Sequence, residues 1–191
     1  QNISLLPQNI HLTLSDISDG MLRDARRALG ARDSRFSFAA FDCEKIPASS
    51  ESYDLVIANH VLFYCDNLEN VCKEVRRVLK PGGRFLCSTY GNSHMKEISQ
   101  LVSRFDARIV LSANKLYEKF GRKNGAQVLE PWFSRVEWIS YEDGLLVSDP
   151  EPLISYILSC HGNQNQYLPD RYKDFRALVK KKTENGFHIT K

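Results

Sequence analysis

Two aspartates near the start of the chain each stand directly after a stretch that favours a β-strand. Asp16 ends the β-branched and apolar stretch 11–15 and is followed by a helix-start pattern with Ser18 in capping position. Asp42 follows the apolar stretch 36–41. In an open α/β sheet, ligands bind outside the carboxyl ends of the strands, where a carboxylate can accept hydrogen bonds from ribose hydroxyls. The sequence therefore predicts a ligand contact at Asp16.

Two further segments repeat this arrangement of a strand end followed by a turn or helix. Residues 54–58, in which the apolar run 55–58 is unbroken, predict a buried parallel strand, which ends at Ala58-Asn59-His60. Asp66 and Glu69 stand in capping-box positions before a helix that ends near Lys80-Pro81-Gly82-Gly83, and residues 84–89 predict another strand. The alternation of strands and helices predicts right-handed crossovers onto a parallel sheet.

The pattern changes after Tyr90 and becomes mainly helical. We expect a single domain over residues 1–191, with a helical insert at about 94–130. The remaining expected elements are helices at 94–106, 113–130, 152–160 and 168–183, a strand at 136–141, a short extended piece at 145–147 and the start of a strand at 187–190.

Composition excludes several classes of partner. The net charge of +3, from 26 basic and 23 acidic residues, gives no electrostatic reason to expect nucleic acid or an anionic membrane. No stretch approaches the length of a membrane span, so we expect a soluble, cytoplasmic protein. The five cysteines contain no C-x-x-C pair, so neither a disulfide framework nor a zinc site follows, and we interpret them as structural thiols.

Taken in order, the strand ends at Asp16, Asp42 and Ala58-Asn59-His60, with the turn 79–83, resemble the class I S-adenosylmethionine-dependent methyltransferases of the small-molecule type. The resemblance covers about residues 10–160. It implies a Rossmann-like α/β fold, S-adenosylmethionine as the cofactor and a small-molecule methyl acceptor. A nicotinamide-type Rossmann protein would also explain Asp16, but it would not explain the turn 79–83.

The resemblance also implies roles for individual residues. Asp16 matches the acid that binds both ribose hydroxyls, and Ile17 matches an apolar contact to the adenine. Asp42 matches the acid that accepts from the adenine amine, and the Cys43 N–H matches the donor to a ring nitrogen. The family segment that passes under the methionine part and the transferable methyl group of S-adenosylmethionine is matched by Ala58, Asn59 and His60.

Other interpretations of these residues stay open. Asp16 could cap the following helix, and Asp42 could form a turn ahead of Pro47. His60 could act as general base, because histidine titrates near neutral pH, or it could simply pack near the cofactor. His94, Tyr64 and Tyr90 could line the acceptor pocket.

One part of the family pattern has no counterpart. Residues 1–15 contain no glycine, so the family's first strand and glycine-rich turn are missing. We therefore expect an incomplete Rossmann-like, mostly parallel sheet in a fragment of a methyltransferase that binds S-adenosylmethionine weakly or not at all on its own. The alternative is a truncated non-catalytic domain acting by association.

The absence of the first strand also leads to an expectation about strand pairing and self-association. In the family's strand order that strand lies between the strand ending at Asp16 and the strand 54–58, so its loss exposes two strand edges. We expect either direct pairing of those two strands or self-association, such as a homo-oligomer, and we favour self-association.

Overall fold

The computed structural model describes residues 7, 9–29, 34–112 and 115–191. The chain divides into two compact units: unit 1 comprises Gln1–Ala58 and Cys65–Leu86, and unit 2 comprises Asn59–Tyr64 and Cys87–Lys191. Each unit is described by itself below. The single domain expected over residues 1–191 stays a prediction.

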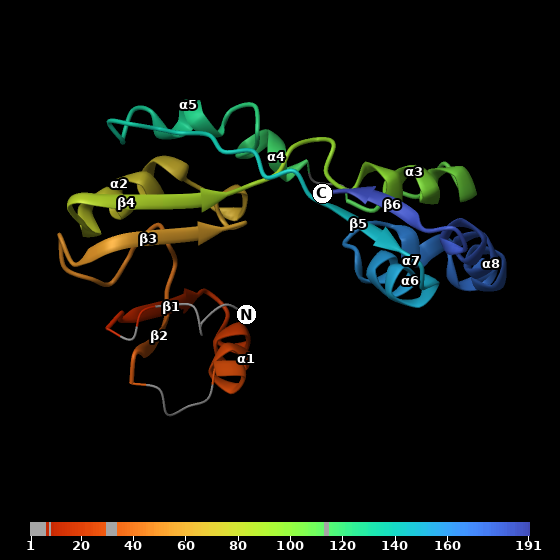
Figure 1. Cartoon of the computed structure of the whole chain (residues 1–191), viewed down its shortest axis with the longest axis horizontal. Helices are drawn as coiled ribbons and strands as arrows, with labels where there is room; N and C mark the ends of the chain where they lie inside the picture. The colour runs from red at the N-terminus through yellow and green to blue at the C-terminus, as the bar shows by residue number, and fades with distance from the viewer. Residues whose placement is uncertain (1–6, 8, 30–33, 113–114) are drawn as a thin grey trace. The chain divides into compact units, whose positions relative to one another are not determined.

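Unit 1 begins with a parallel pair of strands joined by a helix (Figure 1). Its first elements are β1 (Leu12–Asp16), α1 (Asp19–Leu29) and β2 (Phe36–Ala40). The register pairs Leu12 with Phe36 and Asp16 with Ala40, so both strands end at the same edge. The strands predicted around 11–15 and 36–41 are confirmed, as is the helix between them.

A second pair of strands follows, again connected through helical structure (Figure 1). Its elements are β3 (Tyr53–Asn59), η2 (Leu62–Tyr64), α2 (Leu68–Val78) and β4 (Leu79–Ser88). The Ser52 N–H donates to Val78 O, and the His60 N–H donates to Ser88 O, so the partner numbers rise together and β3 and β4 run parallel. The parallel α/β arrangement expected for this half of the chain is confirmed.

The two pairs form separate sheets within the described residues, because β1 pairs with β2 and β3 pairs with β4. The expected alternative of direct pairing between β1 and β3 is therefore wrong. The expectation that β3 is a fully buried strand is also wrong, since Leu55 and Ile57 are 40% and 53% exposed. Leu86 of β4 is exposed to the same degree as Ile57.

The helix α2 begins one residue later than the capping pattern predicts. Its N-cap is Asn67, whose side chain accepts from the Asn70 N–H at 3.1 Å, whereas Asp66 had been expected to cap the helix. Both residue types can cap a helix, so the sequence could not decide between two adjacent candidates. Four residues of α2 are buried against unit 1, namely Val71, Cys72, Val75 and Val78.

This cap gives a prediction for the stability of unit 1. We expect Asn67→Ala to lower the free energy of unfolding by about 1 kcal/mol, because an N–H at the helix start loses its acceptor. Asp66→Ala is the matched control and should cost less than half of that. Urea unfolding of both variants measures the difference, and an equal or larger loss in Asp66→Ala would contradict the observed cap.

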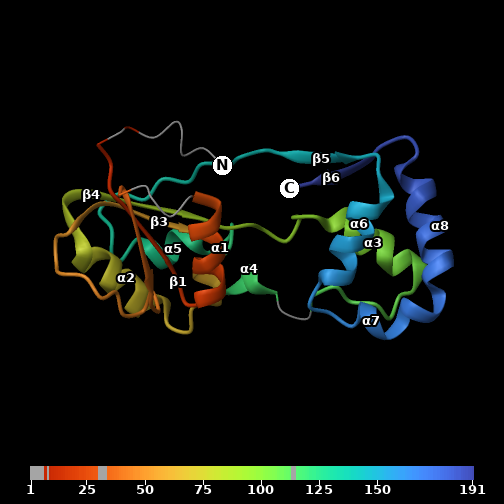
Figure 2. The ribbon, with the colours of Figure 1, turned by 90° about the horizontal axis from the view of Figure 1, so that it is seen from below.

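Unit 2 is mainly helical, with one antiparallel pair of strands (Figure 2). Its elements after β4 are α3 (Lys96–Phe105), α4 (Leu116–Lys119), α5 (Gly125–Leu129), β5 (Gly144–Val147), α6 (Pro150–Ser159), α7 (Gln164–Tyr167), η3 (Pro169–Arg171), α8 (Tyr172–Thr183) and β6 (Phe187–Thr190). The helices expected at 94–106 and 152–160 and the strand start at 187–190 are confirmed. Asp149 caps α6 by accepting from the Glu151 N–H at 3.0 Å.

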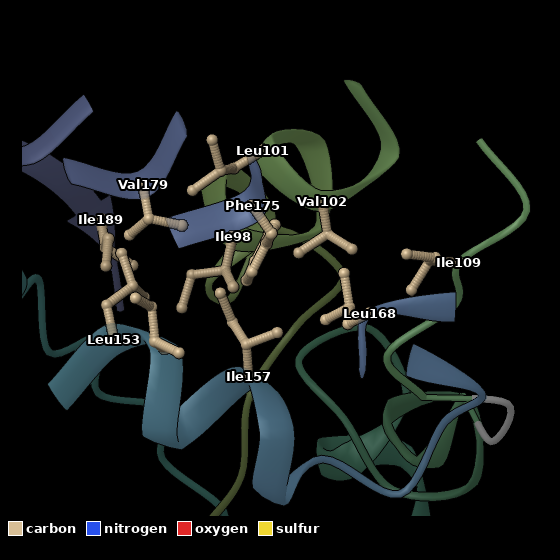
Figure 3. Close-up of a cluster of buried hydrophobic side chains, with 11 residues drawn as sticks. Ile98, Leu101, Val102, Ile109, Leu153, Ile157, Leu168, Phe175, Val179 and Ile189 are labelled. Atoms are coloured by element: carbon tan, nitrogen blue, oxygen red, sulfur yellow. The ribbon is translucent and has the colours of Figure 1, made fainter. Parts of the chain in front are cut away.

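The core of unit 2 lies among α3, α6, α8 and β6. In Figure 3, side chains from the three helices point toward one another, with Ile189 of β6 beside them. Phe175 of α8 is fully buried, and its ring meets the ring of Phe105 edge to face at 5.2 Å. The buried members of this cluster are Ile98, Leu101, Val102, Ile109, Leu153, Ile154, Ile157, Leu168, Phe175, Val179 and Ile189.

The strand expected at 136–141 is absent from this described part of the chain, where the backbone takes no regular secondary structure. Ile139 and Tyr141 are each 84% exposed, and Trp138 is 46% exposed. An apolar, aromatic-rich sequence favours a strand only when a neighbouring strand and a core accept it, and this segment has neither. Among the described residues, no helix combines the length and apolar character needed to cross a membrane.

Candidate functional site

The carboxyl ends of β1 and β2 bring the two predicted acids to one edge of their sheet. Asp16 is the last residue of β1 and pairs with Ala40, the last residue of β2. The Phe41 N–H then donates to the Asp16 carbonyl at 3.3 Å, and Asp42 follows immediately. Sequence reasoning therefore placed both acids correctly relative to the strands.

The Asp16 carboxylate is half-buried and is held by the turn that leads into α1. Its Oδ1 accepts from the Ser18 N–H at 2.8 Å, and Ser18 Oγ accepts from the Met21 N–H at 3.4 Å. Ser18 thus caps α1, while Asp16 fixes the turn before it. Within the described residues Oδ2 accepts no hydrogen bond, so one carboxylate oxygen is open to a ligand. Ile17 beside it is 77% exposed, although it is apolar.

Asp42 is exposed and forms the turn that the more conservative interpretation of the sequence anticipated. Its Oδ1 accepts from the Glu44 N–H at 2.9 Å, and its carbonyl accepts from the Lys45 N–H at 2.9 Å. Such a turn orients the Cys43 backbone. A turn-forming carboxylate keeps lone pairs for a second donor, so this role does not conflict with a ligand contact.

The loop that carries Asp42 and Cys43 is anchored to α2 by an ion pair. Glu74 accepts from the Ile46 N–H at 2.8 Å and from Arg77 Nε at 2.8 Å. Arg77 in turn donates to the carbonyls of Ala48 and Ile46 at 2.7 and 2.8 Å. The hydrogen bond from Arg77 lowers the pKa of Glu74, and burial opposes this effect. Nothing in the spacing of the sequence indicated this contact between residues 28 positions apart.

We expect Glu74→Gln to destabilise unit 1 by about 1 kcal/mol at neutral pH, because the loop loses a charge-assisted contact. A lowered folded-state pKa means that the contribution is present above the ordinary carboxyl pKa of about 4.3 and is lost as the pH falls through the folded-state value. Urea unfolding at pH 7 and below pH 4 should therefore show the difference between parent and variant shrinking in acid.

A matched control lies on the same helix. Glu69 and Lys73 form an exposed ion pair at 2.7 Å, so Glu69→Gln should leave stability nearly unchanged at both pH values. A Glu74→Gln deficit that stays constant between neutral and acidic pH would contradict the assigned role of the charge.

The carboxyl end of β3 supplies Ala58, which is half-buried, and the exposed Asn59 and His60. Ser88 at the end of β4 holds this segment: its hydroxyl donates to Asn59 Oδ1 at 3.3 Å, and its Oγ accepts from the His60 N–H at 3.2 Å. His60 has a φ of 52°, in the left-handed region. Sequence reasoning missed Ser88, although a polar residue at a strand end was a visible signal.

The His60 side chain joins a cluster of aromatic rings within unit 2. Its ring centroid lies 6.2 Å from that of Tyr90 and 6.3 Å from that of Phe63. Tyr90 also contacts His94, with ring centroids 4.9 Å apart, and Tyr117 at 6.4 Å. Tyr90 and His94, two of the three residues suggested for the acceptor pocket, thus lie together beside His60, and the third, Tyr64, has its ring centroid 4.7 Å from that of Phe63.

Burial and the nearby charge of His60 lower the pKa of His94. The lowered pKa favours the neutral form of His94. Burial also raises the pKa of Tyr90, which stays a neutral phenol. This cluster combines a neutral imidazole with apolar ring surfaces, the groups that an acceptor-binding region needs for positioning and proton removal.

Comparison with known proteins shows what the N-terminal part of the chain is similar to. Residues 2–87 match the family model described as a methyltransferase domain. A malonyl-[acyl-carrier protein] O-methyltransferase from Methylococcus capsulatus is 36% identical over 83 residues, which cover 44% of this chain and 30% of that protein. The ubiquinone/menaquinone biosynthesis C-methyltransferase UbiE from Methylobacterium nodulans is 31% identical over 101 residues, covering 52% and 40% of the two chains.

A solved structure from Bacillus halodurans C-125, titled as a candidate methyltransferase, matches 84% of this chain and 68% of its own with a TM-score of 0.55 and 17% identity, which supports the fold alone. The N-terminal part of the chain, residues 2–87, is therefore similar to methyltransferase domains, and its alternating strands and helices agree with that similarity. The chain spans well under half the length of the two curated relatives named above.

Proposed function

We propose that the full-length protein containing this chain transfers a methyl group from S-adenosylmethionine to a small-molecule acceptor. The observation that carries the proposal is the shared edge of β1 and β2, where Asp16 offers an open carboxylate oxygen within the matched methyltransferase domain. The two curated relatives are named for methylation of a carrier-bound malonyl group and for a step of quinone biosynthesis, which supports a small-molecule acceptor.

The residues of this edge fit the chemical groups of the cofactor. Asp16 would accept from the two ribose hydroxyls, with its orientation fixed by the Ser18 N–H. Ile17 would lie against the adenine ring, which gives its exposed apolar side chain a partner. Asp42 would accept from the adenine amine, and the Cys43 N–H would donate to a ring nitrogen. Bound S-adenosylmethionine supplies an electrophilic methyl group, so the protein needs no nucleophile of its own.

The remaining residues would position the acceptor and remove its proton. Ala58 and Asn59 would line the methionine part, with the Asn59 amide held by Ser88. His60 would act as general base toward the acceptor. In this chemistry, much of the rate comes from in-line positioning in a site that excludes water, and Phe63 and Tyr90 provide apolar surface beside His60.

Calorimetric titration of the full-length protein tests the cofactor. S-adenosylmethionine should bind with a micromolar dissociation constant, and NADH should not bind. Binding of NADH in place of S-adenosylmethionine would overturn the proposal and favour a nicotinamide-dependent protein.

Measuring kcat of histidine variants, with an acceptor that the enzyme methylates, tests the proposed general base. His60→Asn should lower kcat about a hundredfold, while the affinity for S-adenosylmethionine changes little, because general base catalysis typically contributes that much. Asparagine is chosen because it tolerates the left-handed backbone of this position. A larger loss in His94→Asn than in His60→Asn would transfer the role to His94.

Self-association is a second candidate property, and exposed apolar residues on β3 and β4 favour it. Leu55, Ile57 and Leu86 are 40%, 53% and 53% exposed, and exposed apolar strand surface recruits partners. Light scattering of the chain at several concentrations tests this, and a strictly monomeric species at high concentration would argue against it.

A further inference from the structure

Two cysteines of unit 1 lie in contact although 22 residues separate them in the sequence. Cys43 stands in the loop after β2 and is half-buried, and Cys65 follows η2 and is 8% exposed. Their sulfur atoms are 3.2 Å apart. Their spacing suggested only structural thiols, because no short cysteine motif connects them.

The backbone around the pair is held in place independently of the sulfurs. The Asn67 N–H, two residues after Cys65, donates to Glu44 Oε1 at 2.8 Å, one residue after Cys43. The Ile46 N–H donates to Glu74 of α2 at 2.8 Å. These contacts follow both cysteines in the sequence and hold the Cys43 loop against the segment after Cys65 and against α2, so a disulfide of about 2.0 Å would need only small movements of the sulfur atoms.

The two thiols are chemically different. The hydrogen bond between the two thiols lowers the pKa of Cys43, while burial and the charges of Asp42 and Glu44 oppose that effect. The same hydrogen bond, together with burial, raises the pKa of Cys65. Cys43 is also the more accessible of the two thiols, so we assign it as the thiol that an oxidant reaches first.

We propose that Cys43 and Cys65 form a reversible oxidation site, in which hydrogen peroxide converts the two thiols into an intramolecular disulfide. This proposal rests on the contact between the two sulfur atoms and on their anchored backbone, and it does not depend on methyl transfer.

The reaction proceeds in two balanced steps. The Cys43 thiolate attacks one peroxide oxygen, the O–O bond breaks, and the departing hydroxide takes up a proton to become water, leaving a sulfenic acid on Cys43. The Cys65 sulfur then attacks the Cys43 sulfur, the S–O bond breaks, and the departing hydroxyl leaves as water with the Cys65 proton. Two thiols lose two electrons in total, and one peroxide becomes two waters. A dithiol reductant reverses the reaction.

Mass spectrometry of the full-length protein tests the proposed oxidation site. After stoichiometric hydrogen peroxide and alkylation of remaining thiols, non-reducing peptide mapping should find one crosslink, between Cys43 and Cys65, with the loss of two hydrogen atoms in mass. Dithiothreitol should remove it. Because this measurement uses the unmodified parent, it remains informative even if a cysteine variant fails to fold.

Variants then assign the two roles. Cys65→Ser should stop at the sulfenic acid, detected as a dimedone adduct on Cys43, and Cys43→Ser should give neither adduct nor crosslink. Cys160 is a thiol of unit 2 that donates to the Tyr156 carbonyl. The variant Cys160→Ser is the control and should form the same crosslink as the parent. No crosslink in the parent, a crosslink to another cysteine, or a first adduct on Cys65 would each overturn the proposal.

Discussion

Replacing Asp16 with alanine in the full-length protein should weaken S-adenosylmethionine binding about 30- to 140-fold, which corresponds to roughly 2 to 3 kcal/mol. The carboxylate would lose charge-assisted hydrogen bonds to two hydroxyls at once. Asp42→Ala should cost about tenfold or less, because that residue is exposed and accepts from a single amine. Calorimetric titration of both variants provides the comparison.

The turn before α1 complicates Asp16→Ala, because the carboxylate also accepts from the Ser18 N–H. Asp16→Asn separates the two effects, since its amide oxygen can still accept from Ser18 while the negative charge is gone. We expect Asp16→Asn to keep the stability of the parent and to lose a large part of its affinity. If Asp16→Asn and Asp16→Ala both bound the cofactor like the parent, the ribose assignment would be wrong.

Phe175→Ala should lower the free energy of unfolding of unit 2 by about 3 to 5 kcal/mol, the largest stability change that we expect. The ring is fully buried and meets Phe105 edge to face, so the truncation removes apolar burial and an aromatic pair and leaves a cavity. Both tryptophans of the chain, Trp132 and Trp138, belong to unit 2, so tryptophan fluorescence during urea unfolding reports on this unit.

Two variants of the same helix serve as controls. Lys173→Ala changes an exposed residue and should leave the unfolding midpoint unchanged. Phe175→Leu keeps most of the apolar volume and should lose clearly less than Phe175→Ala. A fluorescence transition of Phe175→Ala that coincides with the parent would show that α8 does not hold the core of unit 2 together.

The elements of unit 1 could be predicted from the sequence because their signals are local. An apolar strand, a cap and a helical periodicity lie within a few residues of one another, as at Asp16 and Ser18. The strand expected at 136–141 failed for the opposite reason, since Trp138 and Ile139 favour a strand only when a partner is present. The strand propensity of a segment does not tell whether a neighbouring strand is present to pair with it.

The candidate site was predictable where it depends on strand ends and unpredictable where it depends on packing. The positions of Asp16 and Asp42 follow from the rule that acids at the carboxyl ends of parallel strands face the same edge. The hydrogen bond from the Ile46 N–H to Glu74 and the contact between Cys43 and Cys65 depend on how segments that are distant in the sequence pack together. A single sequence contains no signal for such contacts between distant residues.

The left-handed backbone of His60 restricts which amino acids can occupy this position, whatever the side chain does. Glycine, asparagine, aspartate and histidine adopt such a φ at modest cost, whereas valine or isoleucine would strain the end of β3 by about 1 kcal/mol or more. Among those four residues, only histidine carries a group that titrates near neutral pH. The backbone conformation at this strand end therefore limits position 60 to a few residue types. Histidine is the one among them that fits the conformation and can also transfer a proton.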